Sequence, residues 1–178
     1  NYIVLVNAMK EIEVSLLKVE GATLQLLRVQ SFKKANMVQM YCYGRWLVTL
    51  TNSSIDLYEY KEAERVSKLK CEVGSLVKHI SMNGENIYTY SADGRVRQYN
   101  AEALQQQQPT GRDLFGREGM QAIEAFSFGD KDYLAIVGED NTLEVLPVSD
   151  GDSYQLQFQG QFRRLIIRNN LLDVVTYS

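Results

Sequence analysis

The chain has 178 residues, of which 45% are hydrophobic and 23% are charged, and its formal net charge is −3. This composition is typical of a folded globular protein and excludes a wholly disordered chain. The slightly acidic balance gives no overall electrostatic reason to expect binding to nucleic acid or to an anionic membrane. No apolar run reaches the roughly 18 residues that a membrane-spanning helix needs, so we expect a soluble, intracellular protein, cytoplasmic or nuclear.

Alternating apolar and polar residues, rich in β-branched and aromatic side chains, predict strands along the whole chain. In chain order, the predicted strands are 2–6, 11–19, 23–29, 38–43, 47–51, 55–60, 66–71, 76–82, 87–91, 96–100, 122–128, 133–137, 143–148, 154–159, 162–168 and 171–177. No segment shows the periodicity of an amphipathic helix. The sequence therefore predicts an all-β protein.

One pattern repeats along these strands: a small polar turn that separates two apolar strands. It begins at Thr51, at Ser91 and at Gly138, which gives a repeat length of about 40 to 50 residues. Several strands per repeat at this length are typical of propeller blades, because each small sheet can bury its faces only against its neighbours. We label the strands of one blade a to d, from the axis outward.

Turn-forming residues support this division. Residues 44–45, 83–86, 129–132 and 169–170 contain Gly, Asn or Asp and are predicted to join strands a and b. The turns between strands b and c are predicted at 52–54, at Asp93-Gly94 and at Asp140-Asn141. The two sets of turns are expected at opposite ends of the blades.

Two of the repeats resemble a known family. The segment from Ser91 to Asn100 resembles the second half of a WD repeat, with a small residue, an Asp-Gly turn, apolar alternation and a final aromatic-polar pair. The segment from Gly138 to Leu146 is similar, although the Trp-Asp dipeptide and the Gly-His pair of the family are both absent. The resemblance implies a degenerate WD-repeat-like β-propeller of four-stranded antiparallel blades.

The predicted blade periods are 1–43, 44–82, 83–128 and 129–168, with a further strand at 171–178. In a closed ring of four blades this further strand is surplus, whereas seven blades are common in the family that the chain resembles. We therefore expect a fragment of a larger, seven-bladed propeller, with the missing blades supplied by the same or another chain. Residues 105–119 are predicted to be a flexible, Gln-rich loop in place of a strand d.

This predicted loop and the b-to-c turns are expected on one face, which is the predicted binding surface. In the loop, Leu114 and Phe115 are flanked by Arg112 and Arg117 and are predicted to dock onto a partner. Nearby, Arg95 and Arg97 follow the turn formed by Asp93 and Gly94, while Asp140 and Asn141 form the next turn. On the strand at 162–168, a period of two puts Arg164 and Arg168 on the face of Phe162 and Ile166, facing a central channel or a carboxylate in a neighbouring blade.

Known catalytic patterns are absent from the sequence. One His and two Cys do not form a usual zinc site, and no phosphate-binding glycine loop, nucleophile elbow or dinucleotide fingerprint occurs. We therefore predict no catalytic residue, metal or cofactor. The leading hypothesis is a non-catalytic protein–protein interaction scaffold, a subunit of a larger complex that binds other protein subunits or peptides.

Two other functions stay open at this stage. The first is an RNA-contacting subunit of a ribonucleoprotein assembly, whose candidate residues are Arg95, Arg97, Arg112, Arg117, Arg163, Arg164 and Arg168. The second is a propeller enzyme, which requires His79 and several carboxylates to meet in a central channel.

Overall fold

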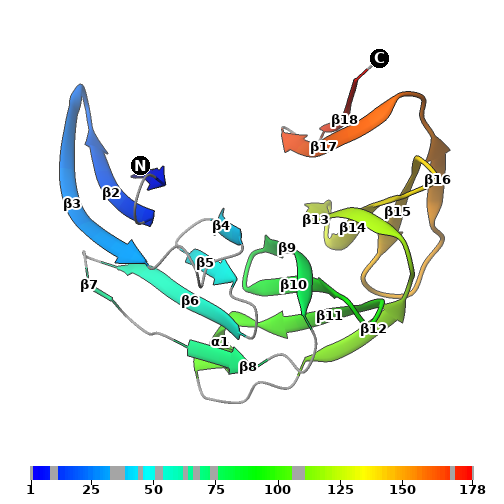
Figure 1. Ribbon diagram of the computed structural model, residues 1–178, viewed down its shortest axis with the longest axis horizontal. Helices are drawn as coiled ribbons and strands as arrows, with labels where there is room; N and C mark the ends of the chain where they lie inside the picture. The colour runs from blue at the N-terminus through cyan, green and yellow to red at the C-terminus, as the bar shows by residue number, and fades with distance from the viewer. Residues whose placement is uncertain are drawn as a thin grey trace. The chain divides into compact units, whose positions relative to one another are not determined.

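The computed structural model describes residues 2–8, 12–32, 39–43, 46–50, 54–61, 64–65, 69–72, 76–105, 111–168 and 171–177. The chain divides into two compact units, Asn1–Glu72 and Val73–Ser178, which we describe separately. Among the described residues, all elements but one short helix are strands, and they form antiparallel sheets (Figure 1). The prediction of an all-β chain with four-stranded antiparallel sheets is confirmed.

The first unit contains two sheets. One has the order β1-β2-β3, with β1 at Tyr2–Ala8, β2 at Ile12–Glu20 and β3 at Thr23–Phe32. The other contains β4 (Gln39–Tyr43), β5 (Trp46–Leu50), β6 (Ser54–Lys61), β7 (Glu64–Arg65) and β8 (Leu69–Glu72), with β7 and β8 both paired to β6. The buried residues described in this unit alternate along β5 and β6, as expected for strands with one face on a core: Trp46, Val48, Leu50, Ile55 and Leu57.

The second unit contains two four-stranded sheets and a two-stranded one. The first sheet has β9 (Val77–Asn83), β10 (Asn86–Ser91), β11 (Arg95–Asn100) and β12 (Arg112–Gly116), with helix α1 at Ala101–Gln105. The second has β13 (Met120–Phe128), β14 (Lys131–Gly138), β15 (Thr142–Pro147) and β16 (Tyr154–Gln157). The third has β17 (Gln161–Arg168) and β18 (Leu171–Tyr177). In all three, each strand pairs with the one that follows it in the chain.

The three sheets of this unit pack face to face through apolar side chains. Strand β13 lies next to both β9 and β17, so the first strands of the sheets are neighbours (Figure 1). Between the first two sheets, the buried cluster contains Tyr88, Tyr90, Val96, Met120, Ile123, Ala125, Leu134 and Ile136. Between the second and third sheets, the buried cluster contains Ala135, Val137, Leu143 and Leu165. The middle sheet is therefore covered on both faces, which explains the continuous apolar run in β14.

Each first strand carries a β-bulge near its start. Lys78 in β9, Gln121 in β13 and Arg163 in β17 are extra residues with no partner in the register of the adjacent strand. The bulges lie at equivalent places, because the residue before each bulge pairs with Ser91, Gly138 or Thr176 near the end of the second strand. The sheets thus repeat in irregularity as well as in strand order.

One prediction needs correction over part of its length. Residues 105–119 are not a single loop, because Arg112–Gly116 is strand β12, paired with β11. The pairing contains a bulge at Leu114, and both Leu114 and Phe115 pack against the buried cluster between the first two sheets. Their burial stabilises a strand that the surrounding composition did not suggest. Gln105 ends α1, and residues 106–110 lie outside the described residues.

The predicted face of β17 is also wrong. The bulge at Arg163 shifts the alternation, so Phe162 and Leu165 both pack against the cluster between the second and third sheets. Phe162 and Ile166 therefore lie on opposite faces, since one extra residue reverses the alternation.

Of the predicted turns, 83–86 and 129–132 join β9 to β10 and β13 to β14, whereas 44–45, 52–53 and 169–170 lie outside the described residues. The predicted blade boundaries stay a prediction.

Candidate interaction surface

Two turns of the second unit have the same geometry. In the first, the Gly94 amide donates to the Ser91 carbonyl (3.0 Å) and the Arg95 amide donates to the Asp93 carboxylate (3.1 Å). The second turn repeats both bonds, from Asn141 to Gly138 (3.2 Å) and from Thr142 to Asp140 (3.1 Å). Gly94 and Asn141 have φ angles of 73° and 61°, in the left-handed region that Gly and Asn tolerate best. Asp and Gly or Asn are therefore required by the turn itself.

The loop Arg117–Gly119, which joins β12 to β13, connects these two turns through its main chain. The Arg117 amide donates to the Gly94 carbonyl (2.7 Å), and the Glu139 amide donates to the Gly119 carbonyl (2.8 Å). We call the surface formed by Asp93–Gly94, Arg117–Gly119 and Gly138–Asn141 the loop face. Main-chain hydrogen bonds therefore hold the backbone of these three segments in one arrangement.

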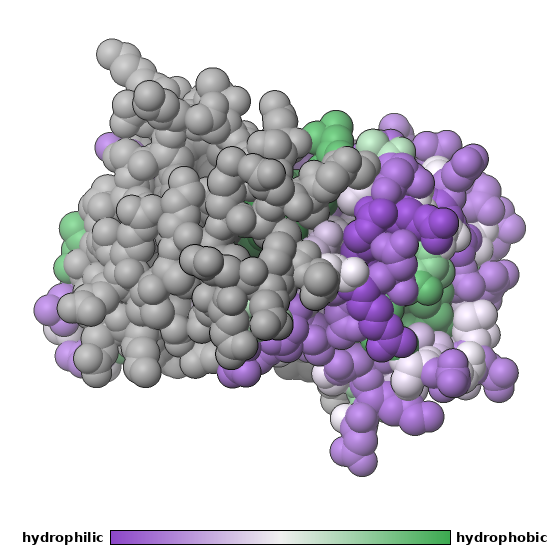
Figure 2. All heavy atoms as spheres, turned by 90° about the horizontal axis from the view of Figure 1, so that it is seen from below, coloured by the Kyte–Doolittle hydropathy of each residue, from purple (hydrophilic) through white to green (hydrophobic). Residues whose placement is uncertain are grey.

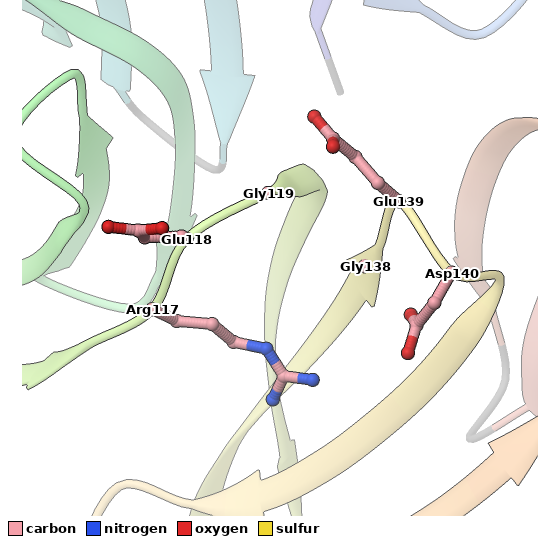
Figure 3. Close-up of a pocket in the computed structure, with 6 residues that line it drawn as sticks. All are labelled: Arg117, Glu118, Gly119, Gly138, Glu139 and Asp140. Carbon is pink, nitrogen blue, oxygen red and sulfur yellow. The ribbon is translucent and has the colours of Figure 1, made fainter.

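A pocket of about 390 Å³ opens on the loop face, lined by Arg117, Glu118, Gly119, Gly138, Glu139 and Asp140 (Figure 3). Both glycines are needed where they lie. A Cβ atom on Gly138 would approach the Asp140 carboxylate to 2.6 Å, and one on Gly119, where φ is 65°, would meet the Glu139 carboxylate at 3.3 Å. The pocket is therefore lined by the bare backbone of two glycines and by four charged residues.

Among the described residues that line this pocket, Arg117 is the only cation, and it is already paired. Its guanidinium donates to the carboxylate of Glu144 on β15, a residue that is only 8% exposed. Figure 3 shows the guanidinium and the Asp140 carboxylate extending into the same space, while Glu118 points away. The Thr142 hydroxyl and amide lower the pKa of Asp140 below its usual range. With Arg117 paired with Glu144, the pocket keeps the negative charges of Glu139 and Asp140.

The two arginines after the first turn do different things. Arg97 forms ion pairs with Asp93 (2.6 Å) and with Asp113 on β12 (2.8 Å), so it joins the turn to the outermost strand of its sheet. The Arg97 guanidinium also donates a hydrogen bond to the Asp93 carboxylate, and this bond is the main reason why the pKa of Asp93 is lowered. Arg95 is exposed, and its side chain lies beside Gly116. Arg97 therefore stabilises the surface, and Arg95 lies exposed next to it.

The loop residues that were predicted to dock onto a partner, Arg112, Leu114 and Phe115, lie in strand β12. Arg112 is exposed at the start of the strand and lines a second pocket, of about 270 Å³, with Leu114, Phe115 and residues 147–151. Leu114 and Phe115 are only partly exposed, because they pack against the core together with Leu146 and Val148. Their main contribution is to the contact between the two sheets.

The three arginines of β17 have different surroundings, and whether Arg164 and Arg168 face a central channel stays a prediction. Arg168 pairs with Asp173 on β18 (2.9 Å), Arg163 lies over the Tyr177 ring (4.8 Å), and Arg164 is exposed. Counted with Arg97 and Arg117, three of the seven candidate RNA-binding arginines form ion pairs with carboxylates of the second unit. A carboxylate partner cancels the charge that a phosphate would need.

His79, required by the enzyme hypothesis, packs as a structural residue. Its ring stacks on Tyr90 at 6.0 Å between centroids, and it hydrogen-bonds the backbone of Met120. Burial lowers the pKa of His79 below the model-peptide value of 6.5. Within the described ranges, no group of three or more His, Cys, Asp or Glu side chains is arranged to hold a metal ion. In the same residues, no helix has the length and apolar character to cross a membrane.

The lowered pKa of His79 predicts a pH dependence of stability. The unfolded chain binds the proton more readily than the folded chain, so this contribution is complete above pH 6.5 and is lost as the pH falls through the lowered pKa. His79 is the one His in the sequence, so the variant His79→Phe removes only this titration. We expect the free energy of unfolding in urea to fall more between pH 7.5 and pH 5.5 for the wild type than for His79→Phe. Equal losses would contradict the assignment.

Several residues of this surface were not found in the sequence. Glu118 and Gly119 lie at the end of the predicted loop and Glu139 lies beside a predicted turn, but nothing in the pattern distinguishes them from other surface residues. Glu144 does leave a signal, since it is the single charged residue in the apolar strand from Thr142 to Pro147. A lone charge of this kind predicts a buried ion pair, although not its partner.

Comparisons with known proteins bear on the fold. No known protein family's sequence profile matches the chain, and no curated protein sequence matches it. Solved structures do match it. BamB from Moraxella catarrhalis has a TM-score of 0.57 at 14% identity, over 96% of this chain and 53% of BamB. The computationally designed protein Ika8 has a TM-score of 0.55 at 14% identity, over 95% of this chain and 54% of Ika8.

PorZ, a bacterial surface component of the type-IX secretion system of Porphyromonas gingivalis, has a TM-score of 0.61 at 10% identity, over 93% of this chain and 23% of PorZ. The chain has a β-propeller-type fold. It spans about half the length of BamB and of Ika8. At such low identity the similarity concerns the fold, in which small antiparallel sheets pack face to face.

Proposed function

We propose that the chain is a non-catalytic interaction scaffold that holds a segment of another protein on its loop face. The observation that supports this most directly is the pair of identical turns joined by main-chain hydrogen bonds around one pocket. Rigid scaffolds that present loops in this way commonly bind other molecules. The propeller-type neighbours support the same class of function, and PorZ is described as a component of a larger secretion system.

The chemistry of the pocket indicates which part of a partner fits it. Glu139 and Asp140 carry negative charge at its rim, while Arg117 is paired with Glu144. A lysine or arginine side chain of the partner provides the opposite charge, and a guanidinium can donate to two carboxylates at once. The partner is therefore proposed to present a basic side chain in a loop or a peptide.

We also infer that the repeats are of the WD type in a degenerate form. The support is the shared geometry of the turns at Asp93-Gly94 and Asp140-Asn141, which lie at the same place in two consecutive sheets. The seven-bladed propeller, its missing blades and the intracellular location stay predictions. Contact with RNA is the weaker alternative, because Arg97, Arg117 and Arg168 already pair with carboxylates.

Site-specific photo-crosslinking tests the proposed function. A photo-reactive amino acid is placed at Glu139 on the loop face and, as the control, at Lys131 in the turn between β13 and β14. In lysate of the source cells, we expect one defined protein adduct from position 139 and none from position 131. The added variant Asp140→Asn is expected to abolish the adduct, because it removes a negative charge from the pocket while its side-chain oxygen can still accept from the Thr142 amide.

Two results would contradict the proposal. One is the same set of adducts from positions 139 and 131, which would indicate nonspecific contact. The other is an adduct at position 139 that survives Asp140→Asn, because recognition would then not depend on the negative charge of Asp140. An adduct with RNA in place of protein would favour the alternative function.

A further inference from the structure

The turn between β9 and β10 contains a chemically reactive pair of residues. Asn83 ends β9 and is followed by Gly84, which forms the one Asn-Gly pair in the sequence. The side-chain amide of an asparagine is open to attack by the backbone nitrogen of the next residue, and Gly allows the closest approach because it has no Cβ. Gly84 is exposed, and a Cβ there would meet no atom within 4 Å. Nothing around Gly84 therefore shields its backbone nitrogen.

The side chain of Asn83, in contrast, is nearly buried and is bonded to the neighbouring sheet. Asn83 is 8% exposed. Its Nδ2 donates to the Ser127 hydroxyl on β13 (2.7 Å) and to the Asp132 carboxylate on β14 (2.9 Å). The Ser127 hydroxyl donates to the same oxygen of Asp132 (2.7 Å). These three hydrogen bonds therefore hold the amide of Asn83 toward β13 and β14.

Deamidation of Asn83 requires this arrangement to open. The Gly84 nitrogen attacks the Cγ atom of Asn83, a new C–N bond forms, and the bond from Cγ to Nδ2 breaks. Nδ2 leaves as ammonia, together with the proton that the Gly84 nitrogen loses. Water then hydrolyses the cyclic imide at either carbonyl and gives aspartate or isoaspartate. Because the reacting atoms have to align, Cγ must turn to the Gly84 nitrogen, and the hydrogen bonds from Nδ2 oppose this rotation.

The surroundings of Asn83 do not compensate a second negative charge. In the part of the chain that the structure describes, Asp132 forms no ion pair with a Lys or Arg. Its charge also reaches the buried Tyr88, because burial and then the negative charge of Asp132 raise the pKa of Tyr88 to about 12. A carboxylate at position 83 would therefore lie next to an unbalanced carboxylate and would repel it.

We propose that Asn83 is a latent deamidation site, which Ser127 and Asp132 keep unreactive in the folded protein and which reacts when β9 separates from β13 and β14. The product does not restore the contact, because a carboxylate at position 83 has no N–H to donate and repels Asp132. A temporary separation of the two sheets therefore becomes a permanent modification. The site lies outside the loop face, and it does not depend on the proposed function.

Peptide mapping by mass spectrometry, after incubation of the whole 178-residue protein at pH 8, measures the reaction. We expect Asn83 to convert at least tenfold more slowly in the protein than in a synthetic peptide of residues 79–88, because only the opened state reacts. Ser127→Ala, at an exposed position, and Asp132→Ala are each expected to speed the conversion severalfold. The matched control is Asp130→Ala in the same turn, which is exposed and is expected to leave the rate unchanged. Equal rates in protein and peptide, an unchanged rate in both Ser127→Ala and Asp132→Ala, or equal acceleration in Asp130→Ala would each overturn the proposal.

The variant Asn83→Asp reproduces one product and tests whether the modification prevents the contact. We expect its urea midpoint to be lower than that of the wild type, because two carboxylates meet where an amide donated to one. The double variant Asn83→Asp with Asp132→Asn is expected to recover part of the loss, since one carboxylate and one amide are then present again. An unchanged midpoint in Asn83→Asp, or no recovery in the double variant, would show that the charge at position 83 does not disrupt the contact and would overturn that part of the proposal.

Discussion

Replacing Gly160 with alanine is expected to lower the free energy of unfolding by about 3 kcal/mol. Gly160 precedes β17 and has a φ angle of 93°, which residues with a Cβ atom rarely adopt. An added Cβ would lie 2.6 Å from the Tyr177 carbonyl oxygen and 3.2 Å from the Thr176 side chain. The backbone at Tyr177 has to move to relieve the clash, which disturbs the pairing of β17 with β18. Urea denaturation followed by circular dichroism measures the change.

Gly84 provides the matched control for this prediction. Its φ angle of 56° is also left-handed, but a Cβ there meets no atom within 4 Å. Gly84→Ala should therefore show the conformational cost alone, about 1 kcal/mol. Similar losses for the two variants would mean that the contact with Tyr177 has no energetic importance.

Replacing Arg117 with methionine is expected to cost about 3 kcal/mol of stability. The change removes the cation that pairs with Glu144 and leaves this nearly buried carboxylate without a partner. An unpaired buried charge costs far more than the pair itself contributes. Thermal or urea unfolding of the single variant measures the loss.

Two further variants identify the cause of that loss. The double variant Arg117→Met with Glu144→Met is expected to recover most of the stability, since neither charge is then left unpaired. Arg168→Met breaks the exposed pair with Asp173, whose side chains are 69% and 39% exposed, and should cost less than about 1 kcal/mol. If the double variant were as unstable as the single one, packing around Arg117 would be the cause and the charge would not.

The parts of the fold that the sequence predicted correctly depend on local chemistry. Strand alternation and the turns at Asp93-Gly94 and Asp140-Asn141 are set by residues close together in the chain. The assignment of β9–β11 and β13–β15 to the strands of successive sheets follows from these turns together with those at 83–86 and 129–132. The fold class was therefore predictable without any knowledge of which sheets are neighbours.

The parts that were missed depend on contacts between distant segments. Strand β12 is stabilised because Leu114 and Phe115 pack against a buried cluster that includes Leu134 and Ile136 of the next sheet. The bulge at Arg163 changes which side chains of β17 face the core, and the sequence around Arg163 contains no residue that indicates a bulge. The pocket needs Arg117 beside Glu144, and only the packing of two sheets brings them together.

The way the loop face is held together makes it suitable for redesign. Figure 2 shows that the described residues on one face of the molecule are mostly hydrophilic, with a patch of apolar atoms among them. The main chain holds the two turns in place, because the Ala92 amide donates to the Leu76 carbonyl and the Glu139 amide donates to the Gly119 carbonyl. Within each turn, an Asp side chain and a residue with a left-handed φ set the backbone conformation. Side chains at positions 92, 118 and 139 can therefore be randomised with little effect on stability. A display library diversified at these three sites would create new binding specificities on an unchanged framework.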